Sequence, residues 1–199
     1  YGPNGRDAKK PGFDPLFQSM SGLTNQNGGQ SGQPVFLRTP ICDDTNALML
    51  AVAVMMALYH RDKTGRGQKI DLSLLGTGVL ANSDDFIRYE GKPDRPSADP
   101  GLYGMSAIYR LYETSKGWLF LSCVQPKEWE RLKEVLTELD GSISFEEASA
   151  VDPWNDGLNR ILENQFKTMT VEQWFKRLLA YGVPCMKVAE DNLEGFYNN

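Results

Sequence analysis

Residues 47–59 form thirteen consecutive apolar or small residues, and this run constrains the fold more than any other feature of the sequence. Acidic residues precede the run and basic residues follow it: Asp43, Asp44, His60, Arg61 and Lys63. That arrangement matches the helix macrodipole, so we predict a helix over residues 46–61 that ends at Gly65. A helix that is apolar on nearly every side is expected to be buried. The run is shorter than the roughly 20 residues that a bilayer span needs, so no membrane helix is expected.

The composition is that of a globular chain. Its 199 residues are 41% hydrophobic and 24% charged, which excludes a disordered polyanion, a collagen-like rod and a disulfide scaffold. The net charge of −5 argues against a broad nucleic-acid surface. Cys42, Cys123 and Cys185 are odd in number and lie far apart, as expected for reduced thiols in a cytoplasmic protein. With His60 as the single histidine, we expect no metal site.

The pattern of apolar residues and turn residues predicts two parts. Residues 1–90 form the first part, residues 91–105 a linker rich in Gly and Pro, and residues 106–199 an α+β second part. In the first part we expect helices over 13–20 and 74–89, a flexible loop over 22–34, and extended segments over 35–37 and 68–72. In the second part we expect a hairpin and three helices: 107–112 with 118–123, then 127–139, 156–166 and 171–181. Thr170 and Gln173 have the spacing of a capping box.

The sequence does not indicate a reaction that depends on one of the familiar short catalytic motifs. The loop over residues 63–68 resembles a phosphate loop, but it follows a helix and does not lead into one, which favours a helix end and turn. Cys42 and His60 would lie about 25 Å apart on a single helix, too far for a nucleophile and its base. Asp43 and Asp44 allow two interpretations: capping acids of a helix, or a carboxylate nucleophile that attacks an activated acyl group. Composition and spacing alone do not decide between them.

Several separate segments carry a more specific signal. Residues 1–5 and 11–22 resemble the G-[FY]-G-x-x-G-P and P-G-[YF]-D-x-x-x-Q-A-x-S-G segments of family III CoA-transferases, the CaiB/BaiF family. Residues 40–43 resemble the segment that carries the catalytic aspartate of that family. Similar matches, in the same order, cover residues 64–75, 109–121 and 182–185. The resemblance extends over essentially the whole chain.

The resemblance implies a large α/β domain, of which residues 1–90 are a part, and a small α+β domain in interlocked homodimers. Family members are about twice as long, which leads us to expect that a preceding segment and a returning C-terminal segment lie outside this chain. The first residue, Tyr1, and the abrupt end at residues 194–199 agree with that expectation. Nucleic acids and membranes are not expected partners.

The resemblance also implies a reaction. Asp43 would attack an acyl-CoA thioester, forming an aspartyl–acyl anhydride and then an aspartyl-CoA thioester, before an acceptor acid takes the CoA. Acyl-CoA and a small carboxylic acid would be the substrates, with no tightly bound cofactor. Nothing in the sequence selects the acids. A site that carries such intermediates must exclude water.

Further residues match positions near the CoA site of the family. Phe13 stands where the related acyl-CoA racemases carry a histidine base, so a racemase is the weaker alternative. Asp14 either orients the site or caps a helix, and Leu74 either lies near the CoA arm or packs in the core. Gly101 and Gly104 match a mobile lid that is richer in glycine in related enzymes, so a plain turn is equally open. A CoA-binding homologue without turnover is the non-enzymatic alternative.

Overall fold

The computed structural model describes residues 1–136, 141, 143–150 and 156–190. It divides the chain into two compact units, Tyr1–Arg95 and Pro96–Asn199, with separate hydrophobic cores. The assignment of the units to a part of a CoA-binding domain and to a small domain stays a prediction.

The first unit is helical in its described residues. It contains α1 (Asp14–Met20), α2 (Leu23–Gln26), the 3-10 turn η1 (Gly29–Ser31), α3 (Ile41–Thr64), α4 (Leu74–Ala81) and α5 (Ser83–Phe86). Helix α1 packs against α2, α3 and α4, and α3 also packs against α4. Their shared core is small, with Phe17, Leu23 and Cys42 buried at its centre.

Helix α3 is longer and more exposed than the sequence predicts. It runs over 24 residues, because the acids before the apolar run and the polar residues after it are helical as well. It ends at Gly65, whose φ of 72° is the left-handed conformation that glycine adopts without strain. Of its residues only Cys42 is buried, so the prediction of a buried helix is wrong for this chain. Side chains such as Met55 and Met56 are about two-thirds exposed, at 66% and 65%.

By length and composition α3 could also cross a membrane. Its most apolar 18-residue window has a mean hydropathy of 1.6, and 6% of that window is buried. The helix continues beyond both ends of the thirteen-residue apolar run, so that run underestimates its length. Length and composition alone are weak evidence for a span, because the core helices of soluble proteins share them.

Three other predictions for the first unit need correction. The expected flexible loop over residues 22–34 contains two short helical turns, α2 and η1. Residues 68–72 alternate like a strand but form none, since no strand lies among the described residues of this unit to pair with them. The helix expected over 74–89 breaks at Asn82 into α4 and α5.

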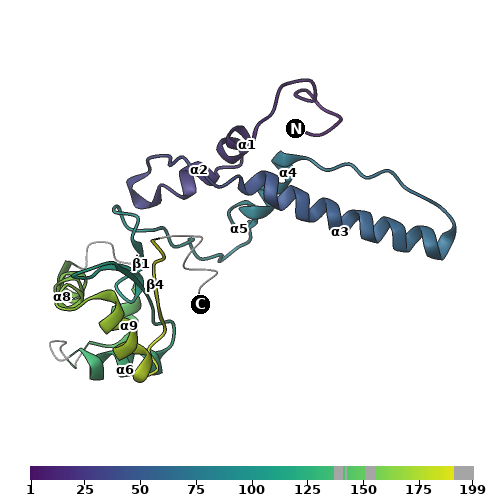
Figure 1. Ribbon diagram of the computed structural model, residues 1–199. Helices are drawn as coiled ribbons and strands as arrows, with labels where there is room; N and C mark the ends of the chain where they lie inside the picture. The colour runs from purple at the N-terminus through teal and green to yellow at the C-terminus, as the bar shows by residue number, and fades with distance from the viewer. Residues whose placement is uncertain (137–140, 142, 151–155, 191–199) are drawn as a thin grey trace. The chain divides into compact units, whose positions relative to one another are not determined.

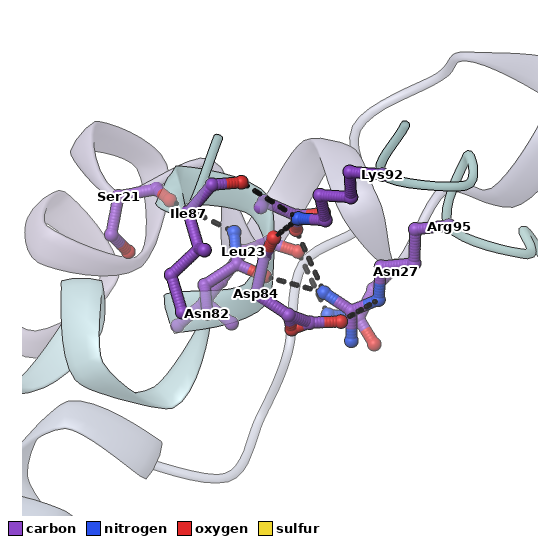
Figure 2. A network of polar contacts seen from close by, with 9 residues as sticks. Ser21, Leu23, Asn27, Asn82, Asp84, Ile87, Lys92 and Arg95 are labelled. Atoms are coloured by element: carbon purple, nitrogen blue, oxygen red, sulfur yellow. Dashed lines mark hydrogen bonds and ion pairs between the residues drawn. The ribbon is translucent and has the colours of Figure 1, made fainter. Parts of the chain in front are cut away.

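A polar network fixes the segment after α5 (Figure 2). Arg95 Nη1 donates to Asn82 Oδ1 at 2.9 Å and pairs with the carboxylate of Asp85 at 2.7 Å. Asn82 Nδ2 donates in turn to the carbonyl of Ser21 at 3.1 Å, and Lys92 Nζ donates to the carbonyl of Ile87 at 2.8 Å. The network therefore links the end of this unit to the turn after α1.

The second unit is a four-stranded antiparallel sheet with helices packed on it (Figure 1). The strands are β1 (Gly104–Ser106), β2 (Tyr109–Glu113), β3 (Trp118–Ser122) and β4 (Cys185–Lys187), in the spatial order β1-β2-β3-β4. The helices are α6 (Pro126–Val135), α7 (Phe145–Ser149), α8 (Asp156–Phe166) and α9 (Val171–Ala180). Helix α8 packs against β2, and α9 packs against β3, β4 and α6.

The sequence predicts most of this unit correctly. The expected hairpin is β2–β3, with Tyr109 opposite Ser122 and Glu113 opposite Trp118. The three amphipathic helices are present, and Thr170 and Gln173 form the expected capping box of α9. The last residues predicted for the first of these helices, 137–139, and the chain end at 194–199 lie outside the described residues. Strands β1 and β4 were not predicted, because three residues carry too little alternation.

Candidate active site

The junction of α1 and α3 places one carboxylate against the main chain of another acidic residue. Asp14 is the first residue of α1 and is buried, and its Oδ2 accepts a hydrogen bond from the main-chain N–H of Asp43 at 2.8 Å. The first N–H groups of a helix have no partner within the helix, so a carboxylate from outside satisfies one of them. Asp14 is therefore not the cap of its own helix, which begins after Phe13.

A buried amide holds the carboxylate of Asp14 in turn. Gln18 Nε2 donates to Asp14 Oδ1 and also to the carbonyl of Thr39, the latter at 3.1 Å. Gln18 and Thr39 are functional candidates that the sequence reasoning missed. The available signal was the spacing of four residues between Asp14 and Gln18, which brings two side chains together on a helix.

Asp43 itself lies in the first turn of α3 with its side chain exposed. Its carboxylate stands at the positive end of the helix dipole, where negative charge is favoured. Because its main-chain N–H is held by Asp14, the start of the helix is fixed while the side chain stays exposed. This geometry suits a carboxylate that attacks an acyl group and receives negative charge back when the group leaves.

The neighbouring thiol is not a nucleophile. Cys42 is fully buried, and burial, together with the charges of Asp14 and Asp43, raises its pKa to about 11. It therefore carries its proton at neutral pH. His60 lies on the same helix near its other end, as the sequence predicts, so the two cannot form a pair.

The remaining predicted site residues divide between the two units. Leu74 is half-buried and packs against the small core of the first unit, as one of its two interpretations predicts. Phe13 is 69% exposed and carries no group that could move a proton. Gly101 and Gly104 lie in the second unit. The structure thus brings Asp14 and Asp43 together, while the ligand roles of Phe13, Leu74, Gly101 and Gly104 stay predictions.

An apolar groove of about 320 Å³ runs beside α3. It is lined by Leu48, Met49, Val52, Ala53, Met56 and Leu72. These residues carry no charge, so the groove itself cannot neutralise a phosphate group. Among the described residues, no cluster of three or more His, Cys, Asp or Glu side chains could hold a metal ion.

Comparison with known proteins identifies the fold first. A solved CaiB/BaiF family protein from Brucella suis matches 100% of this chain and 53% of its own, with a TM-score of 0.78 and 25% identity. The fold is therefore the mixed α/β fold of CaiB/BaiF proteins. The chain belongs to CoA-transferase family III, whose family model matches residues 1–193.

Several proteins named as CoA-transferases are similar to most of this chain. It is 24% identical over 195 residues to a probable fatty acyl-CoA transferase of Mycobacterium tuberculosis, covering 92% of this chain and 50% of the relative. It is 29% identical over 140 residues to a succinate–glutarate CoA-transferase of Agrobacterium fabrum, covering 68% and 34%. The human succinyl-CoA:glutarate CoA-transferase is 23% identical over 186 residues, covering 92% and 42%. The chain spans about half the length of the relatives it matches, or less.

Proposed function

We propose that the protein is a CoA-transferase that moves CoA from an acyl-CoA to a small carboxylic acid, with Asp43 as the nucleophile. The observation that carries the proposal is the position of Asp43 at the start of α3, where the buried carboxylate of Asp14 holds its main-chain N–H. Membership of CoA-transferase family III supports the reaction class.

The proposed reaction uses Asp43 twice. A carboxylate oxygen of Asp43 attacks the thioester carbonyl, and the C–S bond breaks, which gives an anhydride and CoA thiolate. The thiolate then attacks the Asp43 carbonyl carbon, releasing the donor acid as a carboxylate and leaving an aspartyl-CoA thioester. The acceptor carboxylate attacks this thioester, and the returning thiolate cleaves the new anhydride at the acceptor carbonyl. The product acyl-CoA leaves, and the Asp43 carboxylate is restored.

Succinyl-CoA is the donor that we propose to test first. Several relatives are named for succinyl-CoA or succinate as one partner, with mesaconate, glutarate or L-malate as the other. Small dicarboxylic acids are accordingly the first acceptors to test. The apolar groove beside α3 offers no charged partner for CoA, so we propose that the CoA phosphates bind elsewhere.

Trapping of the covalent intermediate tests the proposal. The full-length protein is incubated with succinyl-CoA, quenched and digested, and the peptide that contains Asp43 is examined by mass spectrometry. We expect a CoA adduct on Asp43, and a loss of transfer activity of at least about 10³-fold in Asp43→Ala. Asp44→Ala, in the same turn, is the matched control and should retain the adduct. Full activity of Asp43→Ala would reject the proposal.

Absence of both adduct and transfer with every donor would favour the alternative of a CoA-binding protein without turnover. The racemase alternative is weaker, because Phe13 cannot act as a base. Solvent deuterium entering the α carbon of a 2-methylacyl-CoA would support it, and we expect no such exchange.

We further propose that the protein acts in the cytoplasm as a homodimer. The three cysteines are unbonded in the structure, which suits a reducing compartment. The exposed apolar side chains of α3 suit a surface that is covered in the assembled protein. Light scattering of the full-length protein should give twice the mass of one chain, and a monomer mass would contradict the dimer.

A further inference from the structure

The loop that joins residue 99 to β1 surrounds a carboxylate from its own chain. Asp99 Oδ1 accepts hydrogen bonds from the main-chain N–H of Gly101 at 2.8 Å and of Tyr103 at 3.3 Å. Its Oδ2 accepts a third from Gly104 at 3.0 Å. Main-chain hydrogen bonds close the same loop. The N–H of Asp99 donates to the carbonyl oxygen of Gly104 at 2.7 Å, and the N–H of Leu102 donates to the carbonyl oxygen of Asp99 at 2.8 Å. Three amides of the loop thus point at one internal anion.

A buried cation stands behind this anion. Arg110, on β2, is 6% exposed, and its Nη2 lies 3.9 Å from Asp99 Oδ2 and 3.3 Å from Glu163 Oε1. Its guanidinium also lies over the ring of Tyr103 at 5.3 Å, and that ring stacks on Trp118 at 5.5 Å. Charge and ring contacts therefore hold both ends of the loop to the sheet.

The backbone of the loop is constrained as well. Leu102 has a φ of 60°, a left-handed conformation that residues with a side chain rarely adopt. Gly104 approaches β2 so closely that a Cβ there would lie 2.2 Å from the Cβ of Arg110. An unfavourable backbone conformation persists only where surrounding contacts determine it. Here the hydrogen bonds to Asp99 are the contacts that hold the loop in this conformation.

We propose that Asp99, with Arg110 as its counter-ion, is a positioning residue that locks the loop over residues 99–104 in one preformed shape. The loop of this chain is therefore a fixed element and not the freely mobile lid that its resemblance to related enzymes suggests.

Hydrogen exchange measured on peptides across the loop tests the lock without any assay of activity. In the unaltered protein we expect slow exchange at the amides of Gly101, Tyr103 and Gly104. Asp99→Ala should speed their exchange at least tenfold and leave the β2–β3 amides unchanged. Asp99→Asn, which keeps one acceptor oxygen but loses the charge, should fall between the two. Asp94→Ala, outside the loop, is the control. Equal exchange in Asp99→Ala and the unaltered protein would overturn the proposal.

Discussion

At the scale of single residues, the candidate site depends on a buried carboxylate that does not itself react. Asp14 accepts the main-chain N–H of Asp43, and Gln18 holds Asp14 in turn. Both of these partners are buried, whereas the side chain of Asp43 is exposed. A buried polar pair of this kind fixes the geometry of the main chain while it leaves the side chain of Asp43, the proposed nucleophile, exposed.

Loss of the Asp14 carboxylate should weaken the start of α3. In Asp14→Ala the N–H of Asp43 and the amide of Gln18 lose a buried acceptor, which costs about 1–3 kcal/mol. Denaturant unfolding followed by far-UV circular dichroism, which detects the 24-residue helix, measures this loss. Asp44→Asn is the control, and it should cost only about 0.3–1 kcal/mol through the helix dipole. Equal effects of the two substitutions would contradict the role assigned to Asp14.

The buried thiols predict how stability depends on alkaline pH. Burial raises the pKa of Cys123 from 9.0 to about 12 and that of Cys185 from 9.0 to about 11. Above pH 9 the unfolded chain loses these protons while the folded chain keeps them. The free energy of unfolding should therefore be constant with respect to these groups below pH 9 and fall as the pH rises toward 11. Guanidinium unfolding at pH 8 and pH 10, followed by tryptophan fluorescence, measures the change. Equal stability at both pH values would contradict it.

At the scale of elements, close approach of the backbone decides how β1 meets β2. Gly104 opens β1 and pairs with Arg110, with an irregularity in the register before Ser106. A Cβ at Gly104 would lie 2.4 Å from the carbonyl oxygen of Tyr109. Only glycine allows this contact without movement of one strand.

Gly104→Ala should therefore disturb the strand pairing. We expect a loss of about 1–3 kcal/mol, because the new methyl group meets backbone atoms that cannot yield easily. Tryptophan fluorescence during denaturant unfolding detects it, since Trp118 stacks on Tyr103 beside this strand. At Gly141 of the same unit no atom of the described residues, apart from the chain neighbours, lies within 4 Å of an added Cβ, so Gly141→Ala serves as the control. If the Gly104→Ala protein were as stable as the control, β1 and β2 would be able to move apart at little cost in free energy, which would contradict the prediction.

At the scale of the whole molecule, the two units differ in how much of their apolar surface is buried within this chain. The first has a core centred on Phe17, Leu23 and Cys42. The second has a larger core that includes Trp129, Leu162 and Trp174. The long helix of the first unit leaves most of its apolar surface exposed. The second unit is therefore expected to provide most of the stability that this chain has by itself.

A core substitution in the second unit tests that expectation. Leu162 is fully buried at 0% exposure, and Leu162→Ala should cost about 2–5 kcal/mol. All four tryptophans follow Arg95 in the sequence, so their fluorescence reports on the second unit alone. Leu179→Ala is the matched control, because Leu179 is 49% exposed on α9. A loss below 1 kcal/mol for Leu162→Ala would contradict a core that carries the stability of this unit.

The sequence predicts correctly those features that depend on residues close together in the chain. The capping box at Thr170 and the glycine that ends α3 are examples, because neighbouring atoms satisfy them. The predicted strand over residues 68–72 failed because a strand needs a partner, and local alternation contains no information about one. The contact between Asp14 and Asp43 spans 29 residues and arises where α1 packs on α3. The family motifs include both residues, but no rule of sequence spacing predicts that they are in contact.

The sequence by itself determined the family, the hairpin and the three amphipathic helices of the second unit, and the position of Asp43 at the amino end of a long helix. These depend on residue type, periodicity and motif order, which are properties of the linear chain. Only the tertiary structure decided that Asp14 holds the main chain of Asp43, that α3 is exposed in this chain and that Asp99 accepts hydrogen bonds from the amides of its loop. Each of these is set by which atoms meet after distant segments pack, because burial and hydrogen-bond partners exist only in the folded chain.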